Sequence, residues 1–130
     1  MWGEVVKKII SIILMILLTA AIALASAVKP LSVKDARTLI DKTPNLYILD
    51  VRTPEEYQQV RMKNSVLIPL NDLGKRVVEV PKNRPILVVC AIGARSKTAS
   101  DFLVSKGYRE VYHLNDGLVG WFRVGMPVER

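Results

Sequence analysis

Short apolar runs alternate with amphipathic segments along most of this chain. The apolar, β-branched runs predict strands, and these lie at residues 46–51, 66–68, 86–89 and 111–114. Between the strands, apolar positions recur at helical spacing, which predicts helices over residues 34–40, 70–80, 97–103 and 117–124 and another that begins near residue 53. Strands that alternate with helices at this spacing predict an α/β fold, with a parallel sheet, right-handed crossovers and helices on both faces.

Several of the predicted helix ends carry specific signals. Ser32 is placed as an N-cap for the first helix of the domain. Thr53-Pro54-Glu55-Glu56 combines a capping residue, a proline in the first turn and acids near the positive end of the helix dipole. Lys106-Gly107 is typical of a helix C-cap. These signals fix the start or end of three helices independently of the hydrophobic pattern.

The N-terminal segment differs from the rest of the chain. Residues 9–28 contain no charge, proline or glycine; Lys7 and Lys8 precede them, and Ala25-Ser26-Ala27 lies near their end. A basic start, an apolar stretch and a small-residue site are the parts of a secretory signal peptide, and about 20 apolar residues are also enough to span a bilayer as a helix. We therefore expect an N-terminal hydrophobic helix, with residues 1–27 either a signal peptide cleaved after Ala27 or an uncleaved membrane anchor. Either interpretation places the domain of residues 28–130 outside the cytoplasm, in a periplasm or anchored facing outward.

Composition removes several classes of function. The formal net charge is +7 and aromatic residues make up 6% of the chain, yet the basic residues are scattered and form no stripe or stacking platform of the kind that nucleic-acid binding requires. A single cysteine excludes an intramolecular disulfide. One histidine and one cysteine do not make a convincing metal site, so we expect neither a metal nor a cofactor.

The one cysteine occupies a chemically favourable position. Cys90 follows the predicted strand 86–89 and precedes a helix, which puts it at the carboxyl edge of a parallel sheet, where ligands bind. Free amides at a helix start attract anions, Gly93 permits backbone angles closed to other residues, and Arg95 adds a cation. These features favour a thiolate nucleophile over the alternative of an inert buried cysteine.

Four motifs in order resemble the rhodanese homology domain: Leu49-Asp50-Val51-Arg52-Thr53-Pro54-Glu55-Glu56-Tyr57, Ile68-Pro69-Leu70, Cys90-x-x-Gly93-x-Arg95-Ser96 and Leu114-Asn115-Asp116-Gly117-x-x-x-Trp121. The resemblance runs from about Leu31 to Pro127, and with the N-terminal segment the chain is similar to small, single-domain periplasmic rhodaneses. It implies a three-layer fold in which a five-stranded parallel sheet lies between helices. It also implies a sulfurtransferase, which carries sulfane sulfur as a persulfide on Cys90.

The resemblance assigns expected roles to individual residues. A donor such as thiosulfate would supply the sulfur, and cyanide or a thiol would accept it. Between these two steps, the persulfide would be held by the backbone amides of the active-site loop, which are those of Ala91, Ile92, Gly93, Ala94 and Arg95. The Arg95 side chain either serves the anion directly or pairs with an acid to fix the loop. The expected supporting residues are Asp50, Arg52, Ser96 and Trp121, of which Asp50 and Arg52 would brace neighbouring loops and Trp121 would form a hydrophobic wall near the active loop. Glu56, Tyr57 and His113 are interpreted as structural.

The length of the loop separates the possible activities. Cys90 to Arg95 is a C-x4-R loop, as in the sulfurtransferases, whereas related phosphatases have C-x5-R, which is wide enough for phosphate. This disfavours a phosphatase or arsenate reductase. A binding or sensor module that uses Cys90 for persulfide carriage or redox switching, without multiple turnover, stays open as the alternative. Because Ala91, Ile92 and Ala94 are uncharged, the loop does not identify the donor.

Overall fold

A parallel sheet of five strands forms the centre of the domain in the computed structural model. Residues 1–25 and 27–130 are described, with side chains for residues 1–19 and 27–130. The strand order is β1-β5-β4-β2-β3, with every pair parallel. The strands are β1 (Lys29–Leu31), β2 (Tyr47–Asp50), β3 (Ser65–Leu67), β4 (Ile86–Val89) and β5 (Val111–Leu114). The helices are α1 (Trp2–Ala25), α2 (Val33–Lys42), α3 (Pro54–Gln59), α4 (Leu70–Arg76), α5 (Ala94–Ser105) and α6 (Gly117–Arg123), with a short 3-10 turn, η1 (Val77–Glu79).

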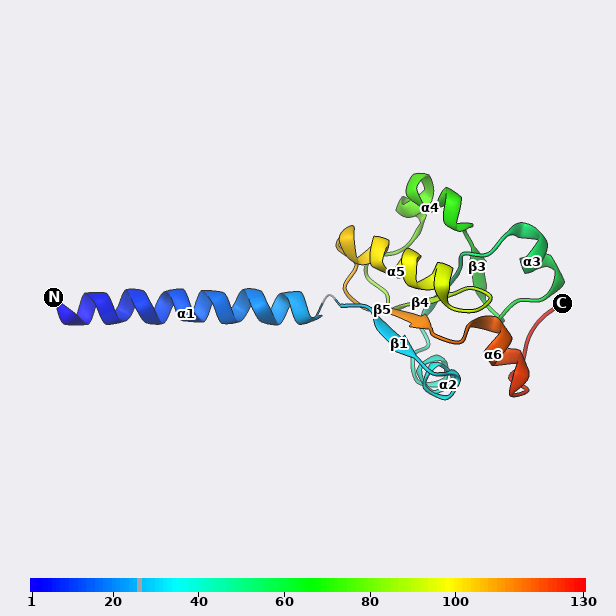
Figure 1. The fold of residues 1–130 in the computed structure, drawn as a ribbon, viewed down its shortest axis with the longest axis horizontal. Helices are drawn as coiled ribbons and strands as arrows, with labels where there is room; N and C mark the ends of the chain where they lie inside the picture. The colour runs from blue at the N-terminus through cyan, green and yellow to red at the C-terminus, as the bar shows by residue number, and fades with distance from the viewer. Residues whose placement is uncertain (26) are drawn as a thin grey trace.

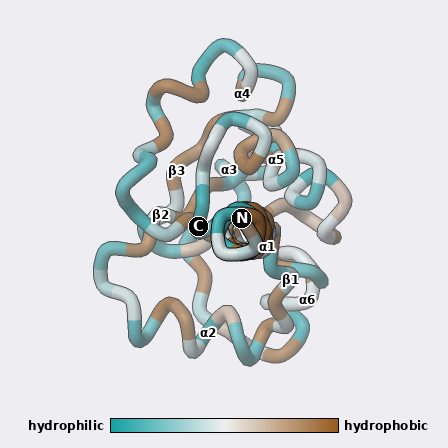
Figure 2. Tube along the Cα trace, turned by 90° about the vertical axis from the view of Figure 1, so that its left-hand side faces the viewer, coloured by the Kyte–Doolittle hydropathy of each residue, from teal (hydrophilic) through white to brown (hydrophobic). Residues whose placement is uncertain are grey.

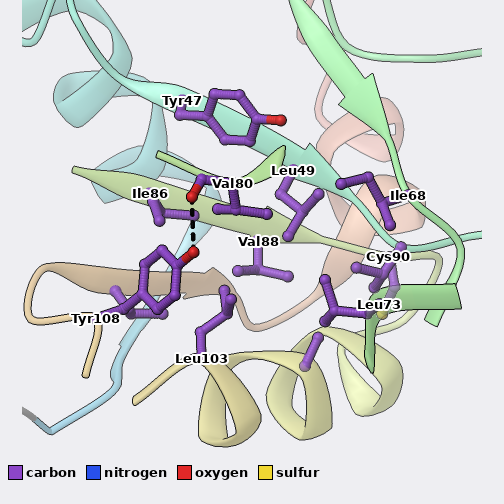
Figure 3. Packing of buried hydrophobic residues seen from close by; sticks show 13 residues of the cluster. Tyr47, Leu49, Ile68, Leu73, Val80, Ile86, Val88, Cys90, Leu103 and Tyr108 are labelled. Carbon is purple, nitrogen blue, oxygen red and sulfur yellow. Dashed lines mark hydrogen bonds between the residues drawn. The ribbon is translucent and has the colours of Figure 1, made fainter. Parts of the chain in front are cut away.

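Helices cover both faces of this sheet, and each face has its own hydrophobic core (Figure 1). Alternate residues of a strand point to opposite faces, so Leu49 and Val88 join Cys90, Leu73 and Leu103 in the core beneath α4 and α5 (Figure 3). Their neighbours in the strands enter the core beneath α2 and α6, which contains Ala36, Ile48, Met62, Leu87, Val89, Leu114, Leu118 and Trp121. The central strand β4 is buried along its whole length. The expected three-layer α/β architecture with five parallel strands is confirmed.

The predicted helix signals form the hydrogen bonds expected of them. The Ser32 hydroxyl accepts from the Asp35 amide at 3.1 Å. Thr53 and Glu56 make a complete capping box, with Pro54 as the first helical residue. After α5, Gly107 has φ +92°, and the Gly107 amide donates to the Val104 carbonyl at 3.0 Å. These bonds satisfy backbone groups that a helix leaves unpaired at its ends.

Two local predictions need correction. The hydrophobic pattern predicts no strand before residue 46, but Lys29–Leu31 forms the edge strand β1, paired with β5. An edge strand tolerates Pro30 because it needs hydrogen bonds on one side only. The helix predicted over 70–80 ends at Arg76 and continues as η1, where a tighter turn ends the helix before Pro81.

The predicted N-terminal helix is present as α1, which is drawn apart from the domain (Figure 1), and its hydrophobic residues are brown in the view along its axis (Figure 2). The described side chains of α1 are exposed. No helix within the described residues has both the length and the apolar character needed to cross a bilayer. The predicted cleavage site includes Ser26, which lies outside the described residues.

Candidate functional site

Cys90 lies between the end of β4 and the start of α5, and its sulfur is an acceptor for the helix. The Gly93 amide donates to Cys90 Sγ at 3.1 Å and the Ser96 amide donates at 3.2 Å. Gly93 is the N-cap residue and has no side chain with which to cap the helix, so the thiol sulfur of Cys90 takes the place of a capping oxygen. Two amides and the positive end of the α5 dipole thus converge on one sulfur atom, an arrangement that stabilises negative charge there.

The loop that holds Cys90 is built on two glycines whose conformations are difficult for other residues. Gly93 has φ +102°, and a β-carbon on it would collide with the carbonyl of Asn115. Gly117, with φ +64°, packs in the same way against the backbone of Ala91 and Ile92. The turn between β5 and α6 therefore lies directly on the Cys90 loop.

Hydrogen bonds from α6 fasten this contact. The Leu118 amide donates to the Cys90 carbonyl at 2.8 Å, and the Val119 amide donates to the Ala91 carbonyl at 3.0 Å. Amides in the first turn of a helix have no acceptor within it, so α6 uses these to hold the carbonyl side of the loop. The Gly93 and Ser96 amides, by contrast, donate to the Cys90 sulfur.

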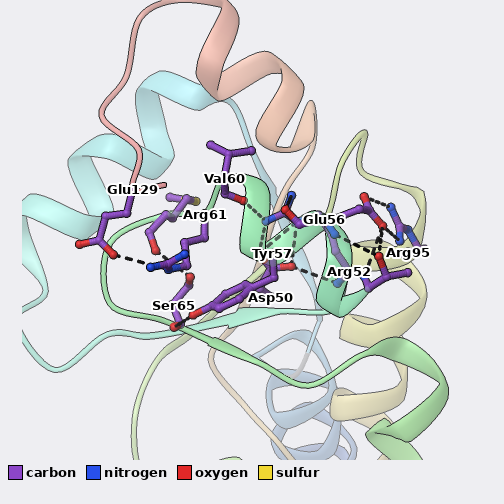
Figure 4. Close-up of polar contacts among 11 residues, drawn as sticks. Asp50, Arg52, Glu56, Tyr57, Val60, Arg61, Ser65, Arg95 and Glu129 are labelled. Carbon is purple, nitrogen blue, oxygen red and sulfur yellow. Dashed lines mark hydrogen bonds and ion pairs between the residues drawn. The ribbon is translucent and has the colours of Figure 1, made fainter.

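Arg95 makes a two-pronged ion pair with Glu56. Arg95 Nη1 and Nη2 donate to the two Glu56 carboxylate oxygens at 2.7 and 3.0 Å (Figure 4). The hydrogen bond from Arg95 is the main cause that lowers the pKa of Glu56 to about 2, and the bonds from Thr53 add to the effect while partial burial opposes it. Of the two roles expected for Arg95, the structure shows pairing with an acid. Glu56 was interpreted from the sequence as a structural residue at the helix start, and the structure adds this ion pair to its role in the capping box.

A buried ion pair closes the neighbouring strand β2. Arg52 donates through Nη2 to Asp50 at 2.8 Å, with both side chains almost fully buried. Further bonds go from Arg52 to the carbonyl oxygens of Glu56 and Val60, at 3.4 and 2.7 Å (Figure 4). A buried charge needs a partner and full hydrogen bonding, and here the pair fixes the chain on both sides of α3. This is the bracing that was predicted for Asp50 and Arg52.

Ser96 connects the loop to the single histidine. Its hydroxyl donates to the Gly93 carbonyl at 2.9 Å and lies 3.2 Å from Nδ1 of His113. Because the one hydroxyl proton serves Gly93, we assign the donor of the second contact as Nδ1–H of His113. Burial lowers the pKa of His113 below its ordinary value, Lys97 adds to the lowering and Asp101 opposes it. A neutral imidazole thus orients the residue whose amide holds the sulfur.

Trp121 lies on the other side of the sheet from the Cys90 side chain. It is buried in the core beneath α2 and α6, and its indole N–H donates to the Pro127 carbonyl at 2.9 Å. It also lines a cavity of about 390 Å³ that no residue from 90 to 96 lines. Trp121 therefore does not form the expected hydrophobic wall beside the active loop. Gly117 and Leu118 at the start of α6 contact the loop instead, and Trp121 lies one turn further along the helix.

The open space beside the loop is a cavity of about 290 Å³, lined by Arg52, Glu56, Gln59, Val60, Ala91, Leu118, Val119 and Phe122. Sequence reasoning missed the part that α6 contributes to this cavity, because Val119 and Phe122 belong to no chemically distinctive motif. Cys90 itself is buried, and Ile92 at the tip of the loop is 69% exposed.

Within residues 1–25 and 27–130, no group of three or more His, Cys, Asp or Glu side chains is placed to hold a metal.

Comparison with known proteins agrees with this arrangement. The family described as the rhodanese-like domain matches residues 32–123. The chain belongs to the rhodanese family. Its rhodanese domain is 34% identical over 86 residues to a sulfurtransferase of Allochromatium vinosum, covering 66% of this chain and 80% of that protein. It is 29% identical over 83 residues to the thiosulfate sulfurtransferase GlpE of Vibrio cholerae, covering 64% and 78% of the two chains.

Solved structures place the rhodanese domain in the same fold. A rhodanese-related protein from Thermoplasma volcanium superposes with a TM-score of 0.70 at 29% identity, covering 78% of this chain and 97% of that chain. Thiosulfate sulfurtransferase from Pseudomonas aeruginosa superposes with a TM-score of 0.69 at 26% identity, over 79% of this chain and 20% of that longer chain.

Proposed function

We propose that this protein is a sulfurtransferase that takes sulfane sulfur from a donor of the thiosulfate type and passes it to a thiophilic acceptor. The observation behind the proposal is the pair of amides, from Gly93 and Ser96, that donate to Cys90 Sγ. A thiolate attacks sulfur far better than a thiol does, and N–H groups directed at the sulfur stabilise the negative charge that a persulfide carries there. Cys90 and Arg95 are the ends of a C-x4-R loop, which is the loop length found in the sulfurtransferases.

The proposed reaction has two steps. The Cys90 thiolate attacks the outer sulfur of thiosulfate, so that a bond forms from Sγ to that sulfur and the sulfur–sulfur bond of the donor breaks, which releases sulfite with the bonding electron pair. Cyanide or a thiolate then attacks the outer sulfur of the persulfide, and Cys90 leaves as a thiolate. The helix-start amides stabilise the anion before and after each step. Arg95, held by Glu56, keeps the first turn of α5 in place instead of meeting the donor.

A sulfur carrier without multiple turnover is the second candidate. The YrkF protein of Bacillus subtilis, whose name describes a proposed sulfur carrier, is 32% identical over 97 residues, which are 75% of this chain and 52% of that one. The enclosed position of Cys90 suits retention of a persulfide until a partner arrives. The two candidates differ in whether sulfur leaves Cys90 repeatedly for a small acceptor.

We also propose that residues 1–27 direct the domain out of the cytoplasm. Support comes from the sequence alone: Lys7 and Lys8, the apolar stretch after them and Ala25-Ser26-Ala27. A reporter that requires export, fused after Arg130, should be active. Activity confined to a reporter that works in the cytoplasm would contradict the proposal.

The enzymatic proposal is tested with the full chain, thiosulfate and cyanide. Thiosulfate should add the mass of one sulfur atom at Cys90, and cyanide should remove it and yield thiocyanate over many turnovers. Cys90→Ser should do neither, because an alkoxide is not available at neutral pH and no persulfide forms on serine. Addition of sulfur without turnover would favour the carrier, whereas turnover by Cys90→Ser would exclude a Cys90 persulfide.

A further inference from the structure

Exposed apolar side chains gather around the Cys90 loop. In the domain of residues 28–130, the large hydrophobic residues exposed to solvent are Val66, Val78, Ile92, Val119, Phe122 and Val124. Ile92 lies on the loop itself, and Val119, Phe122 and Val124 lie on or directly after α6. We call these four residues the apolar rim. Single exposed apolar residues are normal on a protein surface, but a group of them beside a reactive site marks a binding surface.

The apolar rim is one continuous surface. Ile92, Val119 and Val124 line the same depression, between α6 and the start of α2. Val119 also lines the 290 Å³ cavity together with Phe122 and Ala91, so it joins the two hollows. Because Ala91 lines the cavity and Ile92 lines the depression, an object seated on this surface lies against the loop that begins at Cys90.

Charged groups beside the rim are mainly basic. Lys34 and Arg123 line the depression with Ile92, and Asp116 lines it too. Neither Lys34 nor Arg123 forms an ion pair within the described part of the chain. Of the charged groups at the adjacent cavity, Glu56 is occupied by Arg95 and Arg52 by Asp50. The two exposed cations are therefore available to an acidic partner.

We propose that the sulfur acceptor is a cysteine in an acidic protein segment that places an apolar side chain on the apolar rim. This inference rests on the proposed sulfurtransferase function and names its acceptor class. The acceptor thiolate attacks the outer sulfur of the Cys90 persulfide; a bond forms between the two sulfur atoms, the bond to Sγ breaks, and Cys90 leaves as a thiolate while the acceptor becomes a persulfide. Cyanide and other small acceptors do not need an exposed apolar surface in order to bind. In protein interfaces, by contrast, a few buried anchor side chains, often aromatic, supply most of the affinity.

Synthetic peptides test this with the full chain. An acidic peptide has one Cys, a nearby Phe and several Glu residues; one matched peptide has Lys in place of Glu, and another has Ser in place of Phe. The full chain is loaded with sulfur from thiosulfate, and transfer is followed by the mass of each peptide and, separately, by thiocyanate formed with cyanide. The acidic Phe peptide should accept sulfur at least about fivefold faster than either matched peptide, the factor that about 1 kcal/mol represents.

Variants of the chain show whether the surface is responsible. Arg123→Glu should reduce the preference for the acidic over the basic peptide by about fivefold or reverse it. Phe122→Asp should lower the ratio of peptide transfer to cyanide transfer. Val78→Asp is the matched control, since Val78 is 88% exposed and lies on η1, away from α6.

The possible results separate the two proposals. Equal rates for the three peptides, or ratios that Arg123→Glu and Phe122→Asp leave unchanged, would overturn the docking surface while the thiocyanate rate still supports the sulfurtransferase. If thiosulfate leaves no sulfur on wild-type Cys90, the proposed function fails and the acceptor inference fails with it. A loss of the peptide preference in Val78→Asp would also overturn the assignment to the apolar rim.

Discussion

Arg95 and Glu56, which are 39 positions apart in the chain, meet through two hydrogen bonds of 2.7 and 3.0 Å. Arg95 belongs to the first turn of α5 and Glu56 to the first turn of α3. The same carboxylate accepts from the Thr53 backbone amide at 3.3 Å. One side chain thus ties together the loops that follow β2 and β4, and it does so at the edge of the sheet where Cys90 lies.

Glu56→Gln should lower the free energy of unfolding by about 1 kcal/mol at neutral pH, a value at the upper end for pairs that are partly exposed to solvent. The pKa of Glu56 is lowered to about 2, so its ionic contribution is complete above the usual carboxyl range near pH 4.5 and is lost as pH falls from there towards 2. Urea unfolding of both proteins at several pH values measures the difference.

The matched control for this experiment is Glu55→Gln. Glu55 is an exposed residue of the same helix turn and has no ion pair within the described residues. Its substitution should have less effect at neutral pH. A difference between wild type and Glu56→Gln that does not shrink between pH 4.5 and 2 would show that the charge of Glu56 is not what stabilises the contact.

Gly93→Ala should destabilise the domain by about 2 kcal/mol or more, since it combines an unfavourable backbone conformation with a collision against the Asn115 carbonyl. Gly125→Ala should cost about 1 kcal/mol, because Gly125 has φ +77° but open space around the position of a β-carbon. Gly74→Ala should stabilise by about 0.5 to 1 kcal/mol, as Gly74 lies in α4 with nothing nearby. Thermal unfolding of the three variants gives the order, and equal effects of Gly93→Ala and Gly125→Ala would refute the steric part of the explanation.

Ser96→Ala should cost about 1 to 3 kcal/mol of unfolding free energy, because it leaves buried Nδ1–H of His113 without its acceptor. It should also slow sulfur transfer, since Gly93 loses the hydroxyl that holds its carbonyl. Ser100→Ala is the control: Ser100 is equally buried on the same helix, but its hydroxyl has no hydrogen-bond partner within the described residues. That variant should be neutral or more stable than wild type. Similar losses in both would mean that the contact between Ser96 and His113 contributes nothing.

Ile92→Lys should lower the Michaelis constant for thiosulfate by about two- to fivefold at low salt, as a cation is brought near a dianion. The gain is small because position 92 is largely exposed, and about 0.15 M salt should remove most of it. Steady-state kinetics at two salt concentrations, with Val78→Lys as the control, decide the matter. An unchanged constant at low salt would show that the helix-start amides attract the donor without help from side-chain charge.

Most of the fold was predictable because it follows from local signals. Each of these signals specifies structure within a few residues, and all of them form the expected elements: the apolar runs, Ser32, Thr53 to Glu56, and Gly107. Strand β1 was missed because Lys29-Pro30-Leu31 has too few apolar residues to give a pattern. Its strand state comes from pairing with β5, a contact that no local sequence encodes.

The candidate site was predictable for the loop and less so for its surroundings. Cys90, Gly93 and Ser96 sit together because a strand end and a helix start are adjacent in sequence. Glu56 already had a sufficient local explanation in the capping box, so nothing in the sequence indicated its pairing with Arg95. Trp121 shares a short helix with Leu118, but a helix turns by 100° per residue, and the face of α6 that meets the loop was not evident from the sequence.

The sulfur of Cys90 is both the proposed nucleophile and the acceptor that caps α5. A chemical modification of this sulfur therefore changes the hydrogen bonds at the start of the helix as well as the reaction. A second sulfur, or any alkylating group, competes for the Gly93 and Ser96 amides that now satisfy the thiol sulfur. Amide hydrogen exchange at Gly93 and Ser96 therefore offers a direct gauge of sulfur loading that requires no substrate turnover. Preparations that differ in the amount of sulfur bound to Cys90 would also differ in the stability of the first turn of α5.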